Sequence, residues 1–295
     1  MSEDLLNLLL IKSCHENKLE DVKACLTLRA DVNSLSQDGH WTPLTYAAFD
    51  QNLRLLEILL AQPGLNVNKT SACVTDEQGN PYQNTALMVA CHFGYSAVLS
   101  RLIQVKGIDV NVNYQDVHGI TGAMLTIERG HTECLKILAK TGRVNWNMKN
   151  RWGLTPLHRA IHQDVVDIVV QDPNIDFNVR LKRDLTLAHA AVWVGSEKCL
   201  EALAAQEKFD VWNVPDVDGV TPLEVAIRGG KMNMVQILLE CPRVDLNFVN
   251  KYGNTPLMMA IKCDRSDIAK VLMKSPRVDM TIRDRDGSSL TRISR

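Results

Sequence analysis

The clearest candidates for chemistry in this 295-residue chain are two histidines, His158 and His162, which lie four positions apart. On a helix this spacing places both imidazoles on one face, where they could bind one zinc ion. A structural zinc site needs four ligands, however, and no third ligand lies nearby in the sequence. Cys91 and His92 are a weaker pair, because adjacent helical residues point about 100° apart. We therefore predict no metal site and no bound cofactor.

The short motifs of common catalytic sites are also absent from the sequence. There is no G-x-x-x-x-G-K-[ST], no G-x-G-x-x-G after a predicted strand, no G-x-S-x-G and no H-E-x-x-H. A repeat pattern accounts for nearly every residue, so no stretch remains for a catalytic domain. We predict that the chain is not an enzyme.

Charge and cysteine content exclude further classes. The chain has 33 basic and 34 acidic side chains, so no global field attracts nucleic acid or an anionic membrane. The basic run Arg180 to Arg183 is too short for a nucleic-acid footprint, and we interpret it as a solvated turn. The eight cysteines form no C-x-x-C pair and fall mostly among apolar residues, which is typical of buried, reduced thiols.

An apolar stretch, Leu5 to Ile11, lies near the first residue, but acidic residues precede it and it is too short to cross a bilayer. We predict neither a signal peptide nor a transmembrane segment. The expected location is the cytoplasm, with the nucleus as the alternative.

The elements that position these residues follow from one pattern, Gly-x-Thr-Pro-Leu, which returns with a helical stretch behind it. Its anchors are Thr42, Thr85, Thr121, Thr155, Thr186, Thr221, Thr255 and, weakly, Ser289. Successive anchors lie 43, 36, 34, 31, 35, 34 and 34 residues apart. Threonine suits the N-cap of a helix, and proline suits the first helical position.

Four of these segments resemble the T-P-L-H-x-A signature of the ankyrin repeat family, at residues 41–44, 154–160, 220–223 and 254–257. The resemblance implies an all-α fold, an α-solenoid of helix-turn-helix units joined by β-turn or hairpin loops. In the signature, the histidine at His158 is structural. Three repeats lose the proline and have Ala86, Gly122 or Leu187 instead.

We predict a single array over residues 1–295. Its units span approximately 3–38, 39–79, 80–118, 119–152, 153–183, 184–218, 219–252 and 253–286, with a partial unit at 287–295. Contacts between neighbours are expected to hold it as a curved, elongated rod with one concave face. About ten extra residues within 69–84 predict an enlarged loop. A three-residue deficit between Ala160 and Pro173 predicts a shortened helix pair.

Within each unit, a small residue five positions after the anchor lets neighbouring helices approach; it is alanine in most units and Thr126 in one. The second helix is an aliphatic run with helical periodicity, as in 55–60 and 235–239. Each unit then closes with an apolar residue and usually asparagine, as at Val110 and Asn111, and the last with Met280 and Thr281. Trp146, Phe177 and Trp212 are predicted to fill the same inward position.

The resemblance implies an interaction scaffold or adaptor that binds a protein or peptide in its groove and on its turn tips, without nucleic acid or membrane. One alternative is a substrate-recruiting or regulatory segment of a larger enzyme, such as a ubiquitin ligase or kinase. Another is the cytosolic repeat array of a channel or innate-immune receptor. Whether the reading frame continues beyond Arg295 discriminates among these.

The framework does not need the turn tips before each anchor or the end of each first helix for its own packing. Aromatic and arginine residues are frequent at these positions and dominate interface hot spots. A structural alternative is that Phe93 and Trp193 pack against a neighbouring repeat. The predicted partner-binding residues are Phe49, Asp50, His92, Phe93, His118, Arg129, Arg151, Trp152, Lys182, Arg183, Trp193, Asp218, Arg228, Lys251, Tyr252 and Lys262.

Two further expectations concern the last repeats. The family includes substrates of an asparaginyl hydroxylase that favours leucine eight residues upstream and an acidic residue two before, and Leu239 and Asp245 give this pattern to Asn247. An unmodified structural turn is the alternative. The incomplete last unit is expected to leave Ile268, Val271 and Leu272 partly uncovered, so that a monomer frays or weakly self-associates at this end.

Overall fold

Pairs of helices follow one another along the chain. The structure, a computed structural model, describes residues 2–71, 74–75, 81–82, 84–105, 109–163 and 165–283. These residues form two compact parts, an N-terminal segment (Met1–Arg159) and a C-terminal segment (Ala160–Arg295). The elements are α1 (Glu3–His15), α2 (Leu19–Thr27), α3 (Pro43–Phe49), α4 (Leu53–Leu60), β1 (Val74–Thr75), β2 (Pro81–Tyr82), α5 (Ala86–Phe93), α6 (Ser96–Gln104), α7 (Gly122–Glu128), α8 (Thr132–Lys140), α9 (Pro156–Ala160), α10 (Val166–Val169), the 3-10 turn η1 (Lys182–Asp184), α11 (Leu187–Val194), α12 (Glu197–Ala204), α13 (Pro222–Arg228), α14 (Met232–Glu240), α15 (Pro256–Lys262) and α16 (Ser266–Lys274).

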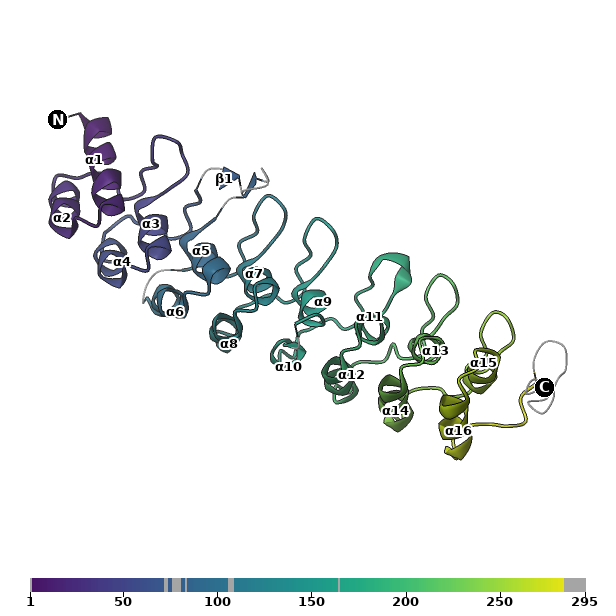
Figure 1. Cartoon of the computed structure of the whole chain (residues 1–295). Coiled ribbons are helices and arrows are strands. Elements are labelled where there is room, and N and C mark those ends of the chain that lie inside the picture. The colour runs from purple at the N-terminus through teal and green to yellow at the C-terminus, as the bar shows by residue number, and fades with distance from the viewer. Residues whose placement is uncertain are drawn as a thin grey trace. The chain divides into compact units, whose positions relative to one another are not determined.

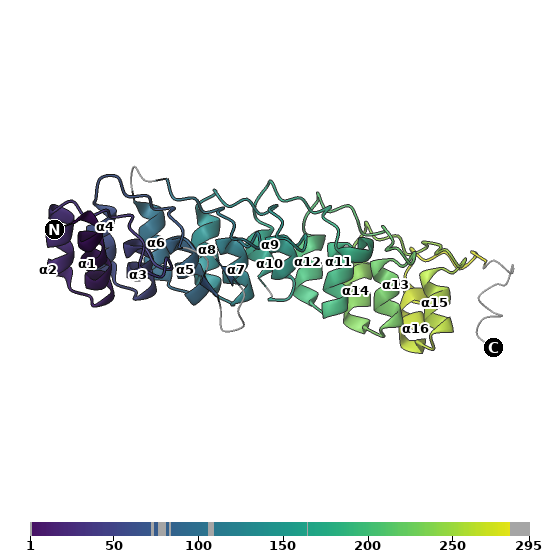
Figure 2. The ribbon, with the colours of Figure 1, turned by 90° about the horizontal axis from the view of Figure 1, so that it is seen from above.

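The helices form two layers within each segment, and this confirms the predicted helical solenoid (Figure 1). In the N-terminal segment α1, α3, α5 and α7 pack in one layer, and α6 packs on α8 in the other. In the C-terminal segment α11, α13 and α15 form the first layer, while α10, α12, α14 and α16 form the second. Figure 2 shows the helices of each layer side by side from above.

The threonine anchors cap the first helices as predicted. The Thr85 hydroxyl accepts the backbone N–H of Met88 at 3.2 Å, and Thr221 accepts that of Glu224 at 3.4 Å. In some repeats the side chain three positions after the cap also accepts a hydrogen bond from the N–H of the cap residue. In one of them the Thr186 N–H donates to Nδ1 of His189 at 3.1 Å. Each such pair satisfies two N–H groups that a helix start otherwise leaves without partners.

The small residue five positions after the anchor is buried in the layer of first helices. Its exposed fraction is 0% for Ala47, Ala90, Ala191 and Ala226, and 1% for Thr126. The Thr126 hydroxyl donates to the carbonyl of Ala123 at 2.8 Å, so its polar group is satisfied. The predicted core role of Trp146, Phe177 and Trp212 is also confirmed, since all three are buried.

Asparagines at the repeat ends connect neighbouring repeats. Asn68 donates to the carbonyl of Asp109 and accepts the N–H of Asn111, both at 2.8 Å. The bridge to the following repeat comes two positions after Asn111, the closing asparagine predicted from the sequence. The bridging residue there is Asn113, which donates to the carbonyl of Arg143 at 2.8 Å, because Asn111 instead accepts the N–H of Asn113 within its own turn.

Both predicted irregularities are visible. The helices on either side of the three-residue deficit, α9 and α10, have only five and four residues. In the enlarged loop, β1 and β2 pair antiparallel, with Val74 opposite Tyr82. The base of this loop is closed by Ser71, whose N–H donates to the Asn84 carbonyl and whose hydroxyl accepts the Asn84 N–H. Residues 72–73, 76–80 and 83 lie outside the described residues.

The expected exposure of the apolar flank of the last repeat is wrong for two of its three residues. Ile268 and Leu272 are buried, because α16 packs against both α15 and α14, and only Val271 is partly exposed. The predicted partial unit at 287–295 lies outside the described residues.

Six of the cysteines are buried reduced thiols, Cys263 is partly exposed, and Cys73 lies outside the described residues. Burial raises the pKa of the Cys14 thiol to about 12 and that of Cys91 well above its usual value. These thiols therefore stay protonated and are poor nucleophiles.

Candidate protein-binding surfaces

The predicted partner-binding residues lie at the surface. His92 and His118 are half-buried, and the other fourteen are exposed. Trp193 is 65% exposed, so the alternative in which it packs against a neighbouring repeat is not what the structure shows. Phe93 is 43% exposed, and its ring contacts that of Phe49 on the preceding first helix. The fold thus leaves large side chains exposed at the ends of first helices and at turn tips.

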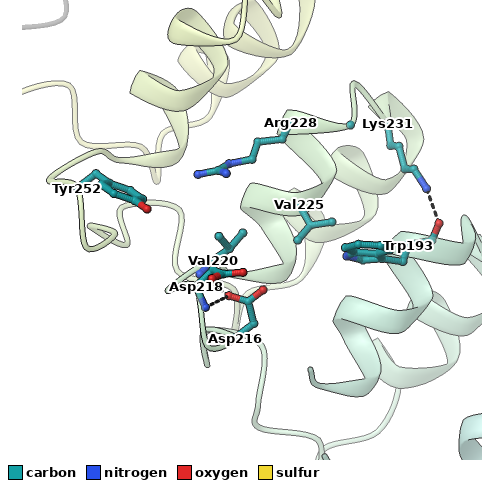
Figure 3. A pocket seen from close by; sticks show the side chains of 9 residues that line it. Trp193, Asp216, Asp218, Val220, Val225, Arg228, Lys231 and Tyr252 are labelled. Carbon is teal, nitrogen blue, oxygen red and sulfur yellow. Dashed lines mark hydrogen bonds between the residues drawn. The ribbon is translucent and has the colours of Figure 1, made fainter. Parts of the chain in front are cut away.

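A pocket in the C-terminal segment brings four of these residues together (Figure 3). Its volume is about 610 Å³. The end of α11, the turn before α13, α13 itself and the turn before α15 contribute its walls. The residues that line this Trp193 pocket are Trp193, Asp216, Asp218, Val220, Val225, Arg228, Gly229, Lys231 and Tyr252.

The acidic side of the pocket is a tight turn of residues 216–220. The Asp216 N–H donates to the Val220 carbonyl at 2.9 Å, and Gly219 has a φ of +76°, which glycine adopts without strain. One oxygen of Asp216, Oδ1, accepts the N–H groups of Asp218 and Val220, both at 2.9 Å. This arrangement fixes both aspartates at the mouth of the pocket.

The two basic side chains of the pocket, Arg228 and Lys231, are both bonded to groups of their own chain. Arg228 donates from Nε to Oε1 of Glu224 at 3.0 Å and pairs with it a second time at 2.5 Å. The Glu224 side chain is 4% exposed and also accepts from Asn250 at 2.9 Å. Lys231 donates to the carbonyls of Val192 and Trp193 at 2.6 and 2.8 Å, so its ammonium closes the C-terminal end of α11.

Charges at neighbouring turn tips hold the turns to one another. Arg183 forms an ion pair with Asp218, and the Val217 N–H donates to the Arg183 carbonyl at 3.2 Å. The basic run at 180–183 is therefore a turn whose Arg183 faces an acidic partner within the chain. Lys182 and Arg183 are not among the residues that line the Trp193 pocket.

The N-terminal segment carries a row of aromatic rings over its first helices. Trp41 stacks on Tyr46 with ring centres 5.0 Å apart, and its ring edge meets Phe49 at 5.1 Å. Phe49 meets Phe93 at 5.3 Å, and Phe93 stacks on Tyr95 at 5.5 Å. Five of the fifteen aromatic residues of the chain therefore form one continuous surface row.

A second aromatic group lies in the turn before α9. The Arg151 guanidinium lies 4.3 Å from the centre of the Trp152 ring, and the His118 ring lies 6.1 Å from it. The two turns are joined by a hydrogen bond from the Arg151 N–H to the His118 carbonyl at 2.9 Å. Trp152 remains 43% exposed.

Several surface residues were not among those predicted from the sequence. Tyr46 and Val225 occupy the fourth position after their anchors, and Tyr95 and Lys231 the tenth. The fourth position shares a helix face with the seventh and eighth, so the i, i+4 spacing was a usable signal for Tyr46 and Val225. The tenth position contacts the preceding repeat: His131 bonds the carbonyl of His92 at 3.0 Å.

The sequence pair His158 and His162 does not form a site. His158 is buried and bonded to Thr155, whereas His162 is exposed. No group of three or more His, Cys, Asp or Glu residues among the described residues could hold a metal ion. Of the described helices, none combines the length and apolar character needed to span a membrane.

Known proteins resemble the chain over most of its length. It is 25% identical to the putative ankyrin repeat protein YahD of Escherichia coli over 228 residues, which cover 77% of this chain and 92% of YahD. It is 33% identical over 101 residues to the SMC5-SMC6 complex localization factor protein 1 of Bos taurus, a match to 33% of this chain and only 10% of that much longer protein.

The helical architecture also matches a solved structure. The human ASB11 ankyrin repeat domain aligns with a TM-score of 0.51 and 26% identity, over 70% of this chain and 90% of that one. A family model described as ankyrin repeats in three copies matches residues 9–114, 111–180 and 184–284. The chain therefore belongs to the ankyrin repeat family.

Proposed function

We propose that this chain is an interaction scaffold or adaptor that binds a protein or peptide partner through its turn tips and the ends of its first helices. Ankyrin repeats are generally protein-interaction modules, which supports the broad class. The observation that carries the proposal is Trp193, a large indole 65% exposed beside a pocket of about 610 Å³. Tryptophan is among the residues most enriched at interface hot spots.

The surroundings of Trp193 support this use of its side chain. Its helix ends at Gly195, which has a left-handed φ of +87°, and Lys231 holds the last carbonyls of the helix. A ring on a fixed backbone loses little conformational freedom when it is covered by a partner. The aromatic row of the N-terminal segment offers a second surface of the same kind.

Affinity purification from native cells with quantitative mass spectrometry tests the proposal. The wild-type chain is compared with Trp193→Ala and with Met273→Ala, a control on the second-layer helix α16 whose side chain is 47% exposed. We expect one set of proteins to be captured by the wild type and by Met273→Ala and to be lost with folded Trp193→Ala. Equal capture by all three chains would exclude Trp193 from the binding surface.

A further inference from the structure

We propose that the Trp193 pocket binds a cationic side chain, arginine or lysine, of the partner. This inference rests on the proposed function and adds the chemistry of one contact to it. Two features carry it: the aromatic and apolar walls of the pocket, and an acidic turn whose negative charge the fold does not require.

The walls suit the stem and the charged end of a long basic side chain. Trp193 and Tyr252 are 65% and 56% exposed, and Val225 lies beside the indole ring (Figure 3). The faces of indole and phenol rings attract a cation electrostatically, and apolar walls cover the methylene groups that precede it. The Tyr252 ring already has the Lys251 ammonium of its own chain 5.3 Å from its centre, so the indole of Trp193 is the ring that we assign to the partner's cation.

The negative charge of Asp216 is not needed to build its turn. Asn150 and Asn250 hold the same position in two other repeats, and each accepts two N–H groups through Oδ1 as Asp216 does. An asparagine therefore makes the same turn, and the negative charge at 216 is not required for it. Among the ion pairs of the described residues, Asp218 is matched by Arg183, and none involves Asp216.

The two basic residues of the pocket do not compete for this role. Arg228 is paired twice with the buried carboxylate of Glu224, and Lys231 is directed to the backbone carbonyls at the end of α11. Lys231 keeps its positive charge at the end of α11, and the carboxylate of Asp216 is the lining acid that forms no ion pair among the described residues. A partner cation gains a charge-assisted hydrogen bond there, whereas a partner carboxylate meets repulsion.

Fluorine NMR of the whole chain labelled with 5-fluorotryptophan reports on this pocket directly. The chain has five tryptophans, and Trp193→Phe assigns the resonance that belongs to the pocket. The probes are mixtures of degenerate nonapeptides that share a fixed central residue: arginine, lysine, citrulline, norleucine or glutamate. Citrulline has the length of arginine without its charge, and norleucine keeps the four-carbon chain of lysine without its ammonium group.

The arginine and lysine mixtures are expected to shift the Trp193 resonance in a saturable way, at concentrations where the citrulline, norleucine and glutamate mixtures do not. Asp216→Asn keeps the turn and should weaken this response about tenfold, as expected for loss of one charge-assisted contact. Asp116→Asn is the matched control, because Asp116 accepts two N–H groups in the same way in a turn of the N-terminal segment. It should leave the response unchanged.

A Trp193 resonance that shifts equally with citrulline or norleucine, or more with glutamate, overturns the cationic assignment. An unchanged response in Asp216→Asn, with its turn intact by circular dichroism, overturns the role of that carboxylate. Neither result would contradict the proposed function. That function is tested separately, by the loss of captured proteins in Trp193→Ala.

Discussion

The Lys231 ammonium donates a hydrogen bond to the backbone carbonyl of Trp193 at 2.8 Å across 38 residues of sequence. A second bond joins it to the Val192 carbonyl at 2.6 Å. These carbonyls are among those that a helix end leaves without intrahelical partners, and a positive charge there also opposes the negative end of the helix dipole. The backbone of Trp193, whose side chain is proposed to bind a partner, is therefore held in place by a residue of the next repeat.

Replacing Lys231 by methionine is expected to lower the free energy of unfolding by about 1 kcal/mol, the net value of one or two exposed hydrogen bonds to a charged group. Urea unfolding followed by circular dichroism measures it. Lys270→Met is the control, since Lys270 forms an exposed ion pair with Asp267 on its own helix at 3.4 Å and its loss should change stability little. Equal stability of both variants would show that the contact with α11 contributes nothing.

Arg243 makes a comparable but larger contact with the preceding repeat. Its guanidinium donates to the carbonyls of Ala204, Gln206, Glu207 and Phe209 at 2.6 to 3.1 Å. Arg243→Met keeps the apolar stem but leaves carbonyls at the end of α12 without these donors. We expect a loss of about 2 kcal/mol. Lys208→Met, which removes a single bond to the Pro173 carbonyl, should cost less.

Native-state hydrogen exchange separates a local effect of Arg243→Met from a global one. Amides around residues 204–212 should exchange faster in the variant than those of α15 and α16. Uniform acceleration across the C-terminal segment would instead mean that the whole segment unfolds as one cooperative unit.

Stability should fall with pH below about 6.5, the unfolded value of histidine. Burial, together with a smaller effect of the Lys149 charge, lowers the pKa of His158 to about 4. The folded state therefore binds fewer protons than the unfolded state between these two values, and this contribution is lost as pH falls through that window. The cost is up to about 1.4 kcal/mol per pH unit. His189 is also buried and shifted in the same direction.

His158→Met tests this assignment, because Met88, Met124 and Met258 occupy the equivalent position in other repeats. The free energy of unfolding is measured in urea at pH 7.0, 5.5 and 4.5. The variant should lose part of the pH dependence between 5.5 and 4.5. If its stability falls as steeply as that of the wild type, His158 does not carry the effect.

The architecture could be predicted because the repeat encodes it locally. Thr221 caps its own helix, and Ala226 is small because a neighbouring helix lies against it, so both roles follow from position within the repeat. The structure of the proposed binding surface could be predicted only in part. Trp193 and Tyr252 were identified as exposed positions, but they lie 59 residues apart in the sequence, and their shared pocket depends on how successive repeats pack.

The bridging asparagine shows the same limit. Asn111 and Asn113 both follow a valine, and the sequence does not distinguish them. The next repeat determines which of the two forms the bridge, because its Arg143 carbonyl and Asn145 N–H form hydrogen bonds with the side chain of Asn113 at 2.8 and 2.7 Å. Asp216 was not among the predicted partner-binding residues, because its place beside Trp193 depends on how neighbouring repeats pack.

Asn247 stays a predicted site of hydroxylation, and its geometry adds a condition. It donates to the Arg277 carbonyl at 2.8 Å and accepts the Asp279 N–H at 2.7 Å, so a modifying enzyme reaches it only when the last described turn opens. Treatment with an asparaginyl hydroxylase should add one oxygen to Asn247, and more readily in Arg277→Met, which loses its bonds to carbonyls of the preceding repeat.

Asn213 is the internal control for this modification. It makes the same two hydrogen bonds, to Arg243 and Asp245, but lacks the upstream leucine and the acidic residue. Peptide mass spectrometry showing no oxygen on Asn247, or as much on Asn213, would contradict the prediction.

Truncation of Trp152 or Trp193 to alanine should each weaken partner binding by about 2 kcal/mol or more, the usual scale for an interface hot spot. The reason is that both rings are large and substantially exposed, at 43% and 65%, so the free protein leaves their area for a partner to cover. Calorimetry with a captured partner measures the change, and circular dichroism confirms that each variant is folded. Met273→Ala, which changes an exposed side chain on α16, should bind as the wild type does. Unchanged affinity in both folded tryptophan variants would place the binding surface elsewhere, and the aromatic row from Trp41 to Tyr95 would be the next surface to truncate.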